Sequence, residues 1–389
     1  PNLLPHFIAT RNGDDIGIDI VRQGNEHVLG ARFADANFFV REDLKQPLEA
    51  YRTGLSKVIF QTKLGSMLDK SERMTRLVNE LIPMLSLEAD EAIFARRAVH
   101  LAKADLVTQM VTEMTSLQGV IGREYALRSG EPREVADAIG EQYQTVPKSK
   151  IGLAVALTDR IDSLVGLFAA GLAPTGAKDP FALRRAALGV VQPLIEHRLS
   201  FDLREALRKA GKLQPVEAKD EVQKQVLDFI TGRLRVVLNE MEYRYDVVDA
   251  VLAEQSANPA LATEAVKQLQ AWVEREDWAT ILPGYARCVR IIRSAQVDTK
   301  KLNVDTKKFV EPEEKNLHKT IKENAKIQPS SVDDLLNIVV KLIPSINAFF
   351  DKVMVMAEDE KVKQNRLALV AQVANLSHGI ADLSKLEGF

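Results

Sequence analysis

Apolar residues recur at helical spacing along most of the chain, three or four residues apart with polar residues between them. The pattern is clearest over residues 153–170, where large apolar side chains would line one side of a helix: Leu153, Leu157, Ile161, Leu164 and Phe168. The one good strand candidate is "HFIATRN", residues 6–12, a β-branched and aromatic run before a turn-like Asn-Gly-Asp-Asp. We therefore expect a mainly α, multi-helical fold with a small strand-containing segment at its N-terminal end.

Glycine, proline and short polar residues predict where the first helices begin and end. Gly24-Asn25 indicates a helix stop followed by an N-cap, and Pro47 opens another helix. The helical pattern then continues over residues 56–82 and again over residues 90–128. These signals predict a series of amphipathic helices with short connections.

Further signals of the same kind lie in the second half of the chain. Gly171 ends the helix of residues 153–170, and Asp179-Pro180 starts the next one, as an N-cap with proline at the first helical position. Ser331 begins a capping box with Asp334 ahead of a strong helix. The segment from about 300 to 327 is highly charged and poor in large apolar residues, so we expect an insertion, arm or linker there.

Composition adds bounds on size and surroundings. The chain has 389 residues, enough for two or three domains at about 100–200 residues each. Its net charge is −2, so a surface for nucleic acid or membrane must be a local patch. Cys288 is the single cysteine, which excludes an internal disulfide and fits a cytoplasmic location. No stretch approaches a membrane span. Because the sequence starts at Pro1 in what resembles a strand, we expect a piece of a longer polypeptide.

The segment "GLAPTGAKDPFALRR", residues 171–185, nearly spells a phosphate-binding loop. Such a loop needs a buried strand before the glycines, whereas an amphipathic helix precedes them here. Ala177 separates the second glycine from Lys178, and Asp179 stands where a magnesium-binding Ser or Thr is needed. The interpretation as a helix–turn–helix connection is therefore favoured over a nucleotide site.

Other catalytic constellations are equally thin. The histidines are scattered without metal-ligand spacing: His6, His27, His100, His197, His318 and His378. Arg287 and Arg290 flank Cys288 and could lower the pKa of its thiol, yet "YARCVRII" is typical of a helix with the cysteine facing the core. We expect no catalytic residue, no metal site and no cofactor in this chain.

One carboxylate pair has a more specific context. Asp159 and Asp162 lie three residues apart in "TDRIDSLVG", which resembles the last conserved helix of HD-domain phosphohydrolases. By the same comparison "HLAKADLVT", residues 100–108, should carry an adjacent His-Asp metal pair. Lys103-Ala104 occupies the best register instead, while His100 and Asp105 are five residues apart. A degenerate HD-like domain is favoured over an active hydrolase.

Together these segments resemble one family, the β subunit of bacterial-type glycyl-tRNA synthetase. The resemblance is carried, over roughly residues 7–195, by "GNEHVLGARFADANFFVRED", "FQTKLGSMLDKSERM", "LAKADLVTQMVTEMTSLQGVIGREYA", "GEPREVADAIGEQY", "TDRIDSLVGLF" and above all "PTGAKDPFALRRAALGV". It continues more loosely through "FITGRLRVVLNEMEYRYDVVDAVLA" and "FFDKVMVMAEDEKVKQNRLALVAQVA", which is similar to the DALR-type anticodon-binding domains shared with arginyl-tRNA synthetase. The family's β subunit is considerably longer, so the chain is similar to its C-terminal half.

The resemblance implies three regions. Residues 1–57 would be the remnant of a preceding domain and a helical linker, residues 58–198 a degenerate HD-like domain, and residues 199–389 a helical anticodon-binding domain with the charged arm at about 300–327. The implied function is to grip glycine tRNA during ATP-dependent joining of glycine. The implied partner is the α subunit, or a fused α region, which holds the aminoacylation site and uses ATP and magnesium.

Basic and aromatic residues are the candidates for contact with tRNA, because phosphates need Lys or Arg and unpaired bases need stacking surfaces. Arg287, Arg290 and Arg293 recur every three residues and predict a cationic stripe on one helix face. The further candidates are Lys178, Arg184, Arg185, Arg233, Arg235, Tyr243 and Arg244. For any single arginine the alternative is a solvated side chain paired with a nearby acid. For Arg184 or Arg185 the alternative is an ion pair between domains.

Two other functions remain open at this point. An HD-type metal-dependent phosphohydrolase would need a metal site, against which the missing His-Asp pair argues. A helical scaffold without RNA affinity would need none of the basic surface.

Overall fold

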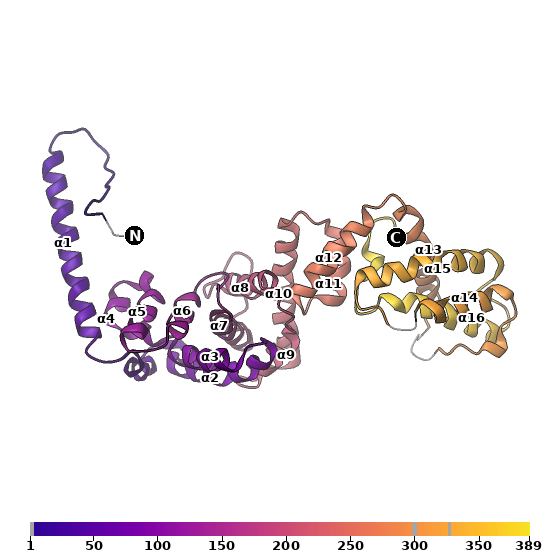
Figure 1. Ribbon diagram of the computed structural model, residues 1–389, viewed down its shortest axis with the longest axis horizontal. Coiled ribbons are helices and arrows are strands. Elements are labelled where there is room, and N and C mark those ends of the chain that lie inside the picture. The colour runs from indigo at the N-terminus through magenta and orange to yellow at the C-terminus, as the bar shows by residue number, and fades with distance from the viewer. Residues whose placement is uncertain (1–3, 298–301, 326–327) are drawn as a thin grey trace.

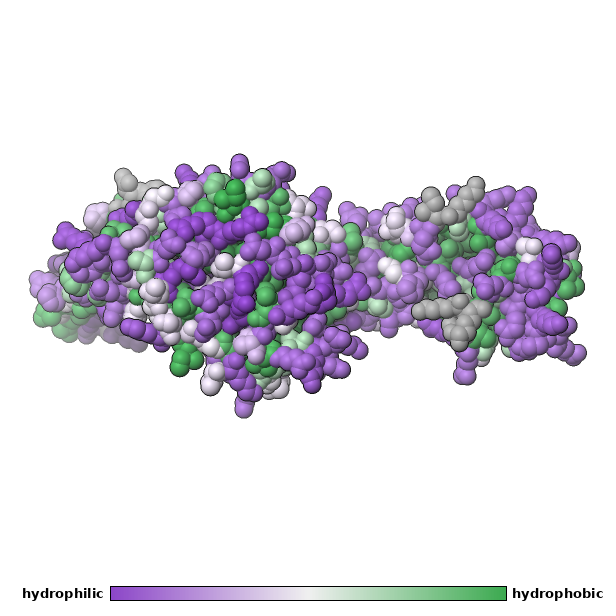
Figure 2. All heavy atoms as spheres, turned by 90° about the horizontal axis from the view of Figure 1, so that it is seen from below, coloured by the Kyte–Doolittle hydropathy of each residue, from purple (hydrophilic) through white to green (hydrophobic). Residues whose placement is uncertain are grey.

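The computed structural model describes residues 4–297, 302–325 and 328–389. Figure 1 shows an extended arrangement in which α1 (Ile18–Asp43) projects from one end, residues 48–240 form a body, and residues 278–389 form a tail at the other end. From below, the body and the tail are two largely hydrophilic masses joined by a narrower waist (Figure 2). The mainly α prediction is confirmed. Among the described helices none is long and apolar enough to cross a bilayer.

The elements of the body are, in chain order, η1 (Leu48–Lys57), β1 (Ile59–Gln61), β2 (Gly65–Ser66), α2 (Met67–Leu81), η2 (Ile82–Met84), α3 (Ala89–Leu101), η3 (Ala104–Val107), α4 (Gln109–Glu113), η4 (Thr115–Leu117), α5 (Val120–Arg128), α6 (Arg133–Glu141), α7 (Lys150–Ala169), α8 (Leu183–Glu196), α9 (Leu203–Gly211) and α10 (Asp220–Glu240). Next come α11 (Tyr245–Gln255) and α12 (Pro259–Val273), which lead to the tail. The tail contains α13 (Trp278–Ala295), η6 (Thr306–Lys308), α14 (Pro312–Asn324), α15 (Val332–Lys352), α16 (Glu360–Ala374), η7 (Asn375–Ser377) and η8 (Leu383–Lys385).

The N-terminal segment departs from the prediction. Residues 6–12 were expected to form a strand but have no strand among the described residues, and Gly24-Asn25 lies inside α1 rather than between two helices. A strand needs a partner for its backbone groups, and this segment is exposed instead, with Ile8 at 97%. A Cβ added at Gly24 would meet nothing within 4 Å, so that glycine marks neither a turn nor a close contact.

The short sheet lies where a continuous helix was predicted over residues 56–82. β1 pairs antiparallel with β2, and the segment after Pro47 is the 3-10 helix η1 rather than an α-helix. Gly65 has a φ of 85°, a conformation that glycine adopts without strain, so the chain reverses there. α2 then begins at Met67, and its N-cap Ser66 forms a reciprocal capping box with Asp69.

α7 is the central helix of the body. It packs against α2, α3, α6, α8, α9 and α10. The five apolar positions predicted to line one side are all buried, and most of the opposite side is buried too, because neighbouring helices surround it. Helices α9 and α10 follow the predicted boundary at residue 199, yet both pack against α7, and α10 also packs against α8. The boundary itself stays a prediction.

The helix predicted over residues 90–128 is interrupted by turns that carboxylates support. Asp43, at the end of α1, accepts the backbone N–H groups of Gln109 and Met110 at 2.8 and 3.0 Å, which fastens α1 to the start of α4. Asp105 accepts the N–H of Gly119 at 2.6 Å, just before α5. These caps come from residues distant in sequence, so the apolar period does not reveal them.

The predicted helix start at Asp179-Pro180 is wrong by three residues. α8 begins at Leu183, and Pro180 lies in the preceding turn. Asp179 still acts as a cap, because its carboxylate accepts the N–H groups of Leu183 and Arg184 at 2.8 and 2.9 Å. Gly171 ends α7 with a φ of 82°, as predicted.

The charged segment at about 300–327 is not an isolated arm in its described part. It contains α14, whose buried Leu317 and Ile321 pack toward α15 and α16. Two apolar residues one turn apart suffice to seat a short helix on existing neighbours, although its composition is mostly charged. Residues 300, 301, 326 and 327 of this segment lie outside the described residues.

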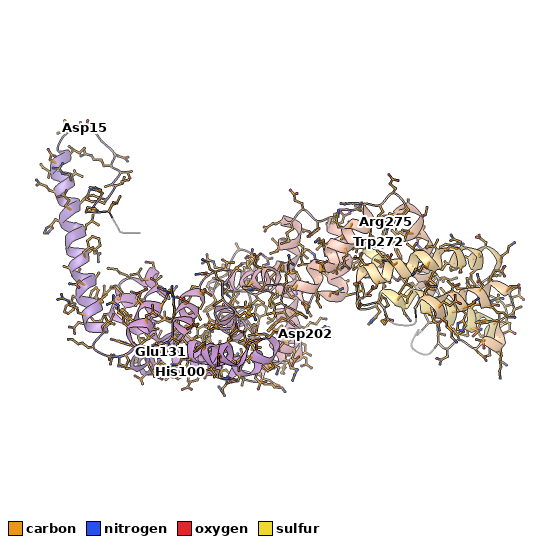
Figure 3. The ribbon with its side chains drawn as sticks, viewed as in Figure 1. Asp15, His100, Glu131, Asp202, Trp272 and Arg275 are labelled. Carbon is orange, nitrogen blue, oxygen red and sulfur yellow. The ribbon has the colours of Figure 1, made fainter. Side chains whose placement is uncertain are left out.

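The tail is joined to the preceding helices by an aromatic residue. Trp272, at the end of α12, donates its ring N–H to Asp333 of α15 at 2.7 Å, and the Arg275 guanidinium lies 4.3 Å from the ring centre. Figure 3 shows both residues near the start of the tail, far from Asp15 beyond the outer end of α1. Ser331 caps α15 as predicted, accepting the N–H of Asp334 at 3.0 Å. The Asp334 carboxylate accepts from the N–H and hydroxyl of Ser330, one residue before the predicted partner.

Candidate nucleic-acid interface

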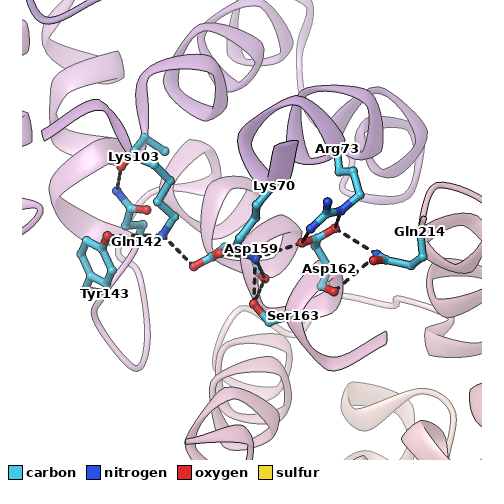
Figure 4. Close-up of polar contacts among 10 residues, drawn as sticks. Lys70, Arg73, Lys103, Gln142, Tyr143, Asp159, Asp162, Ser163 and Gln214 are labelled. Carbon is cyan, nitrogen blue, oxygen red and sulfur yellow. Dashed lines mark hydrogen bonds and ion pairs between the residues drawn. The ribbon is translucent and has the colours of Figure 1, made fainter. Parts of the chain in front are cut away.

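The carboxylate pair of α7 lies in a buried ion cluster, which Figure 4 shows. Lys70 bridges the two carboxylates, with its Nζ 3.0 Å from Asp159 Oδ1 and 3.0 Å from Asp162 Oδ2. Arg73 Nε lies 2.9 Å from Asp162 Oδ1, and Lys103 Nζ lies 2.9 Å from Asp159 Oδ2. Each carboxylate therefore has two cationic partners, and we call these five side chains the ion cluster.

The electrostatics of the ion cluster favour ionised carboxylates. Burial alone would raise the pKa of Asp159 and of Asp162, but the neighbouring cations outweigh it and hold both pKa values below the ordinary 3.8. Gln214 donates to Asp162 at 3.0 Å, and Lys70 donates to the Ser163 hydroxyl at 2.8 Å. Such additional bonds are what a buried ion pair needs to offset its desolvation.

The other candidate metal ligands are engaged elsewhere. His100 Nε2 lies 3.0 Å from Glu49 Oε1, in a surface network around Arg97 that also includes Glu131. Figure 3 labels His100 and Glu131, which lie near each other on the body. Asp105 is buried against the N–H of Gly119, and burial raises the pKa of its carboxyl. Within the described ranges no three His, Cys, Asp or Glu side chains are grouped to hold a metal. Positive charge fills the surroundings of the two α7 carboxylates, which opposes cation binding there.

The basic residues near Gly171 form part of the helix connection. Lys178 is exposed at the end of a tight turn that is closed by its backbone hydrogen bonds with Thr175, at 2.9 and 3.2 Å. Arg184 donates to the carbonyl of Gly176 and lies 3.8 Å from Asp179, so it holds this turn. Arg185 is exposed on α8. Lys178 and Arg185 are therefore accessible, whereas Arg184 is committed to its own loop.

The predicted residues around α10 and α11 do not form one surface. Arg235 is exposed and pairs with Asp249 at 2.8 Å, while Arg233, two residues before it, is half-buried. Arg244 pairs with the buried Asp246 at 2.8 Å and with Glu387 at 3.3 Å. Tyr243 is half-buried and packs against the core. The structure thus gives Arg235 and Arg244 acidic partners within the chain.

The arginine stripe of α13 is present as predicted. Arg287, Arg290 and Arg293 are exposed on one side of the helix, while Cys288 on the other side is fully buried. Burial raises the pKa of the Cys288 thiol to about 12, which agrees with a core residue rather than a nucleophile. Acidic neighbours are few and loosely placed: Asp351 lies 4.0 Å from Arg287 and Asp382 lies 3.4 Å from Arg293.

Two aromatic rings, of Phe350 and Phe389, complete this surface, and neither was among the residues predicted from sequence. The guanidinium of Arg287 lies 4.7 Å from the centre of the Phe350 ring. Those of Arg290 and Arg293 lie 5.5 and 6.0 Å from the centre of the Phe389 ring. Exposed guanidinium planes beside aromatic rings can stack on unpaired bases and bind phosphates together. No local sequence signal links these rings to α13, because they come from distant parts of the chain.

Comparison with known proteins gives a consistent result. A family described as "Glycyl-tRNA synthetase beta subunit" matches residues 1–253, and one described as "DALR anticodon binding domain" matches residues 281–383, which include most of α13. The chain is 39% identical over 401 residues to the glycine–tRNA ligase beta subunit of Moorella thermoacetica, covering 99% of this chain and 57% of that protein.

Two further relatives extend this picture. The beta subunit from Clostridioides difficile is 38% identical over 397 residues, with 99% of this chain and 57% of the relative covered. A chloroplastic/mitochondrial glycine–tRNA ligase of Arabidopsis thaliana is 38% identical over 396 residues, with 100% of this chain and 37% of the relative covered. The chain thus spans little more than half the length of the bacterial relatives. By the extent of these matches, the chain belongs to the family of glycyl-tRNA synthetase beta subunits.

Proposed function

We propose that this chain is the part of a glycine–tRNA ligase β subunit that binds glycine tRNA, with the tail reading the anticodon. The single observation that carries this proposal is the α13 stripe. Its arginines are exposed, lie within the segment that matches the anticodon-binding family, and contact Phe350 of that segment and Phe389 beyond it. Arginine planes and aromatic rings are the chemistry that holds unstacked bases of single-stranded RNA loops.

The remaining parts of the proposal concern partners. The relatives are called beta subunits, which favours an α subunit or fused α region as the partner that performs aminoacylation with ATP and magnesium. In that arrangement this chain supplies tRNA binding and is not catalytic alone, and it works in the cytoplasm. The body would act as a degenerate HD-like support, because the ion cluster places cations where a hydrolase would need a metal.

An electrophoretic shift experiment tests the proposal. The 389-residue chain is titrated against a glycine tRNA transcript and against the same transcript with a mutated anticodon. We expect at least about 5-fold weaker binding of the mutated transcript, since one lost arginine–base contact is worth about 1–3 kcal/mol. Equal binding of both transcripts would remove the anticodon assignment, and absence of binding to either would remove the function.

A phosphatase assay with manganese tests the competing interpretation of the body. Turnover by the chain together with a stoichiometric metal would show that the ion cluster is not the resting arrangement of Asp159 and Asp162. Substituting Lys103 by Met provides the matched variant, because it removes one cation beside Asp159 and leaves the other in place.

A further inference from the structure

A second basic and aromatic surface lies on the tail, outside the α13 stripe. It is an open depression of about 650 Å³ between η6 and the outer side of α14. Its lining includes Phe309, Lys315, His318, Lys319, Lys322 and Glu323. None of these residues is among the tRNA contacts predicted from sequence.

The placement of α14 explains why cations gather there. Its inner side is fixed by the buried Leu317 and Ile321 and by the buried pair of Glu314 with Arg366, whose Nε lies 2.9 Å from Glu314 Oε1. The lysines at positions 315, 319 and 322 recur at helical spacing on the other side, so all three face the depression. Because its inner side is packed in this way, α14 presents its basic side to solvent.

These lysines are weakly neutralised. Lys319 lies 3.9 Å from Glu323, the acidic residue of the lining, and both side chains are largely exposed. Lys315 and Lys322 form no ion pair with the described residues. Exposed pairs at such distances are worth little, so the depression presents net positive charge to an incoming ligand.

The floor of the depression is aromatic. The rings of Phe309 and His318 are 5.4 Å apart between centres and meet at 62°. Burial and the nearby Lys322 lower the pKa of His318, which favours the neutral form of its ring. Both of its ring nitrogens are buried and have no hydrogen-bond partner among the described residues. The floor thus offers aromatic ring surface on which a base can stack, with the two rings inclined to each other.

We propose that this depression binds an unstacked nucleotide of tRNA, with its base on Phe309 and His318 and its flanking phosphates on Lys315, Lys319 and Lys322. This inference rests on the proposed tRNA-binding function and adds a contact to it. An acidic peptide would use the lysines but not the aromatic floor, whereas a nucleotide uses both. Since α13 and α14 both pack on α15 and α16, one tRNA bound to the tail has two surfaces available.

Binding of the 389-residue chain to the glycine tRNA transcript, measured over a series of salt concentrations, tests this site. We expect Phe309→Leu to weaken binding at least about 5-fold, because stacking of one base is worth about 1–3 kcal/mol. Phe309→Tyr should restore it. The double variant Lys315→Gln, Lys322→Gln should lower the salt slope by about 1.4, at about 0.7 per single-strand phosphate.

The matched control removes the same charge elsewhere, at the exposed Lys219 and Lys224 around the start of α10. We expect Lys219→Gln, Lys224→Gln to keep the slope. The variants at Phe309 and at Lys315 and Lys322 should all keep the preference for the intact anticodon, which α13 provides. If the unaltered chain prefers the intact anticodon but the Phe309→Leu and lysine variants bind tRNA with its full affinity, this inference alone is overturned. If the unaltered chain binds no tRNA, both proposals fall.

Two outcomes would assign the depression differently. Equal loss in the α10 control would show a general effect of charge and overturn a local site. Loss of binding to a separately purified α subunit, with tRNA binding intact, would place a protein there instead. Thermal unfolding followed by circular dichroism identifies any variant that has lost its fold. If Phe309→Leu is such a variant, the binding of Phe309→Tyr and of the double lysine variant tests the inference.

Discussion

The ion cluster of the body and the arginine stripe of the tail use the same cationic chemistry in opposite ways. In the ion cluster the side chains of Lys70 and Arg73 are each 3% exposed, and each is paired with a carboxylate at 2.9–3.0 Å. In the stripe Arg287 and Arg293 are 42% and 57% exposed, and their nearest acids lie at 4.0 and 3.4 Å. In the first arrangement every cation is buried and paired with a carboxylate, whereas the second leaves exposed guanidinium groups for a ligand.

The difference shows how burial decides the use of a charged residue. A buried cation must be paired, because losing its hydration costs several kcal/mol. The ion cluster is therefore a structural element that joins α2, α7 and the turn between α3 and η3. An exposed arginine keeps its hydration and its planar donors, so it can exchange water for phosphate or a base. Counting basic residues therefore does not locate an RNA surface, whereas their partners and exposure do.

The largest expected effect comes from breaking the ion cluster. Asp162→Ala removes the carboxylate that pairs with the buried Lys70 and Arg73. Because it leaves buried positive charge without this partner, it should lower the free energy of unfolding by about 3–5 kcal/mol. Urea denaturation measures the loss. Asp249→Asn, which breaks the exposed pair with Arg235, should cost at most about 1 kcal/mol as the matched control. Similar losses in both variants would contradict the contrast between buried and exposed pairs.

Acidification should weaken the ion cluster in the unaltered chain, with a smaller effect than the substitution. The folded-state pKa values of Asp159 and Asp162 lie below the ordinary 3.8. Their contribution is therefore complete above the unfolded-state pKa and is lost as pH falls through the folded-state values. Urea denaturation from about pH 6 to about pH 3 should show stability falling below about pH 4. The loss of stability with falling pH should be smaller in Asp162→Ala. Parallel curves of stability against pH for the variant and the unaltered chain would show that the ion cluster does not cause the loss.

Breaking the stripe should affect binding instead of stability. Arg287→Ala, Arg290→Ala and Arg293→Ala should each cost about 1–3 kcal/mol of binding to glycine tRNA, or roughly 5- to 150-fold in affinity. Urea midpoints should stay near that of the unaltered chain, because these side chains are exposed. Fluorescence anisotropy with intact and anticodon-mutated transcripts measures the binding. A variant that loses affinity for both transcripts equally holds a phosphate rather than a base.

The sequence predicted helix type well and helix limits poorly, for a physical reason. Apolar period reports which face of a segment is buried, and it correctly indicated α7 and α13. The ends of a helix depend on the groups that bond its free backbone N–H groups. Here the N–H groups of Gln109 and Gly119 are bonded by Asp43 and Asp105, and no sequence pattern near either position indicates this. The short sheet was missed because Val58, Leu64 and Leu68 keep a helical spacing through the turn at Gly65.

The candidate sites show the same division. Lys103 was identified as the residue that replaces a metal ligand, and the structure indeed places its ammonium on Asp159. Lys70 and Arg73 were not, since α2 meets α7 only after folding. Likewise the spacing of the three α13 arginines is local and was predicted, whereas Phe350 and Phe389 reach the stripe from distant segments. In each site, spacing along the sequence predicts the residues of one helix, whereas the residues that come from other segments become visible only in the folded structure.

The smallest expected effect tests whether the aromatic rings orient the stripe. Phe350→Leu and Phe389→Leu keep apolar volume but remove the ring faces beside Arg287, Arg290 and Arg293. A cation–π contact at an exposed site is worth about 0.5–1 kcal/mol, so each variant should weaken tRNA binding about 2- to 5-fold. Phe350→Tyr serves as the control that keeps a ring and should bind as the unaltered chain does. If the leucine variants match the unaltered affinity while the arginine variants lose it, the arginines act without aromatic support. If Phe350→Leu loses more than Arg287→Ala, the Phe350 ring itself is the stacking surface for a base.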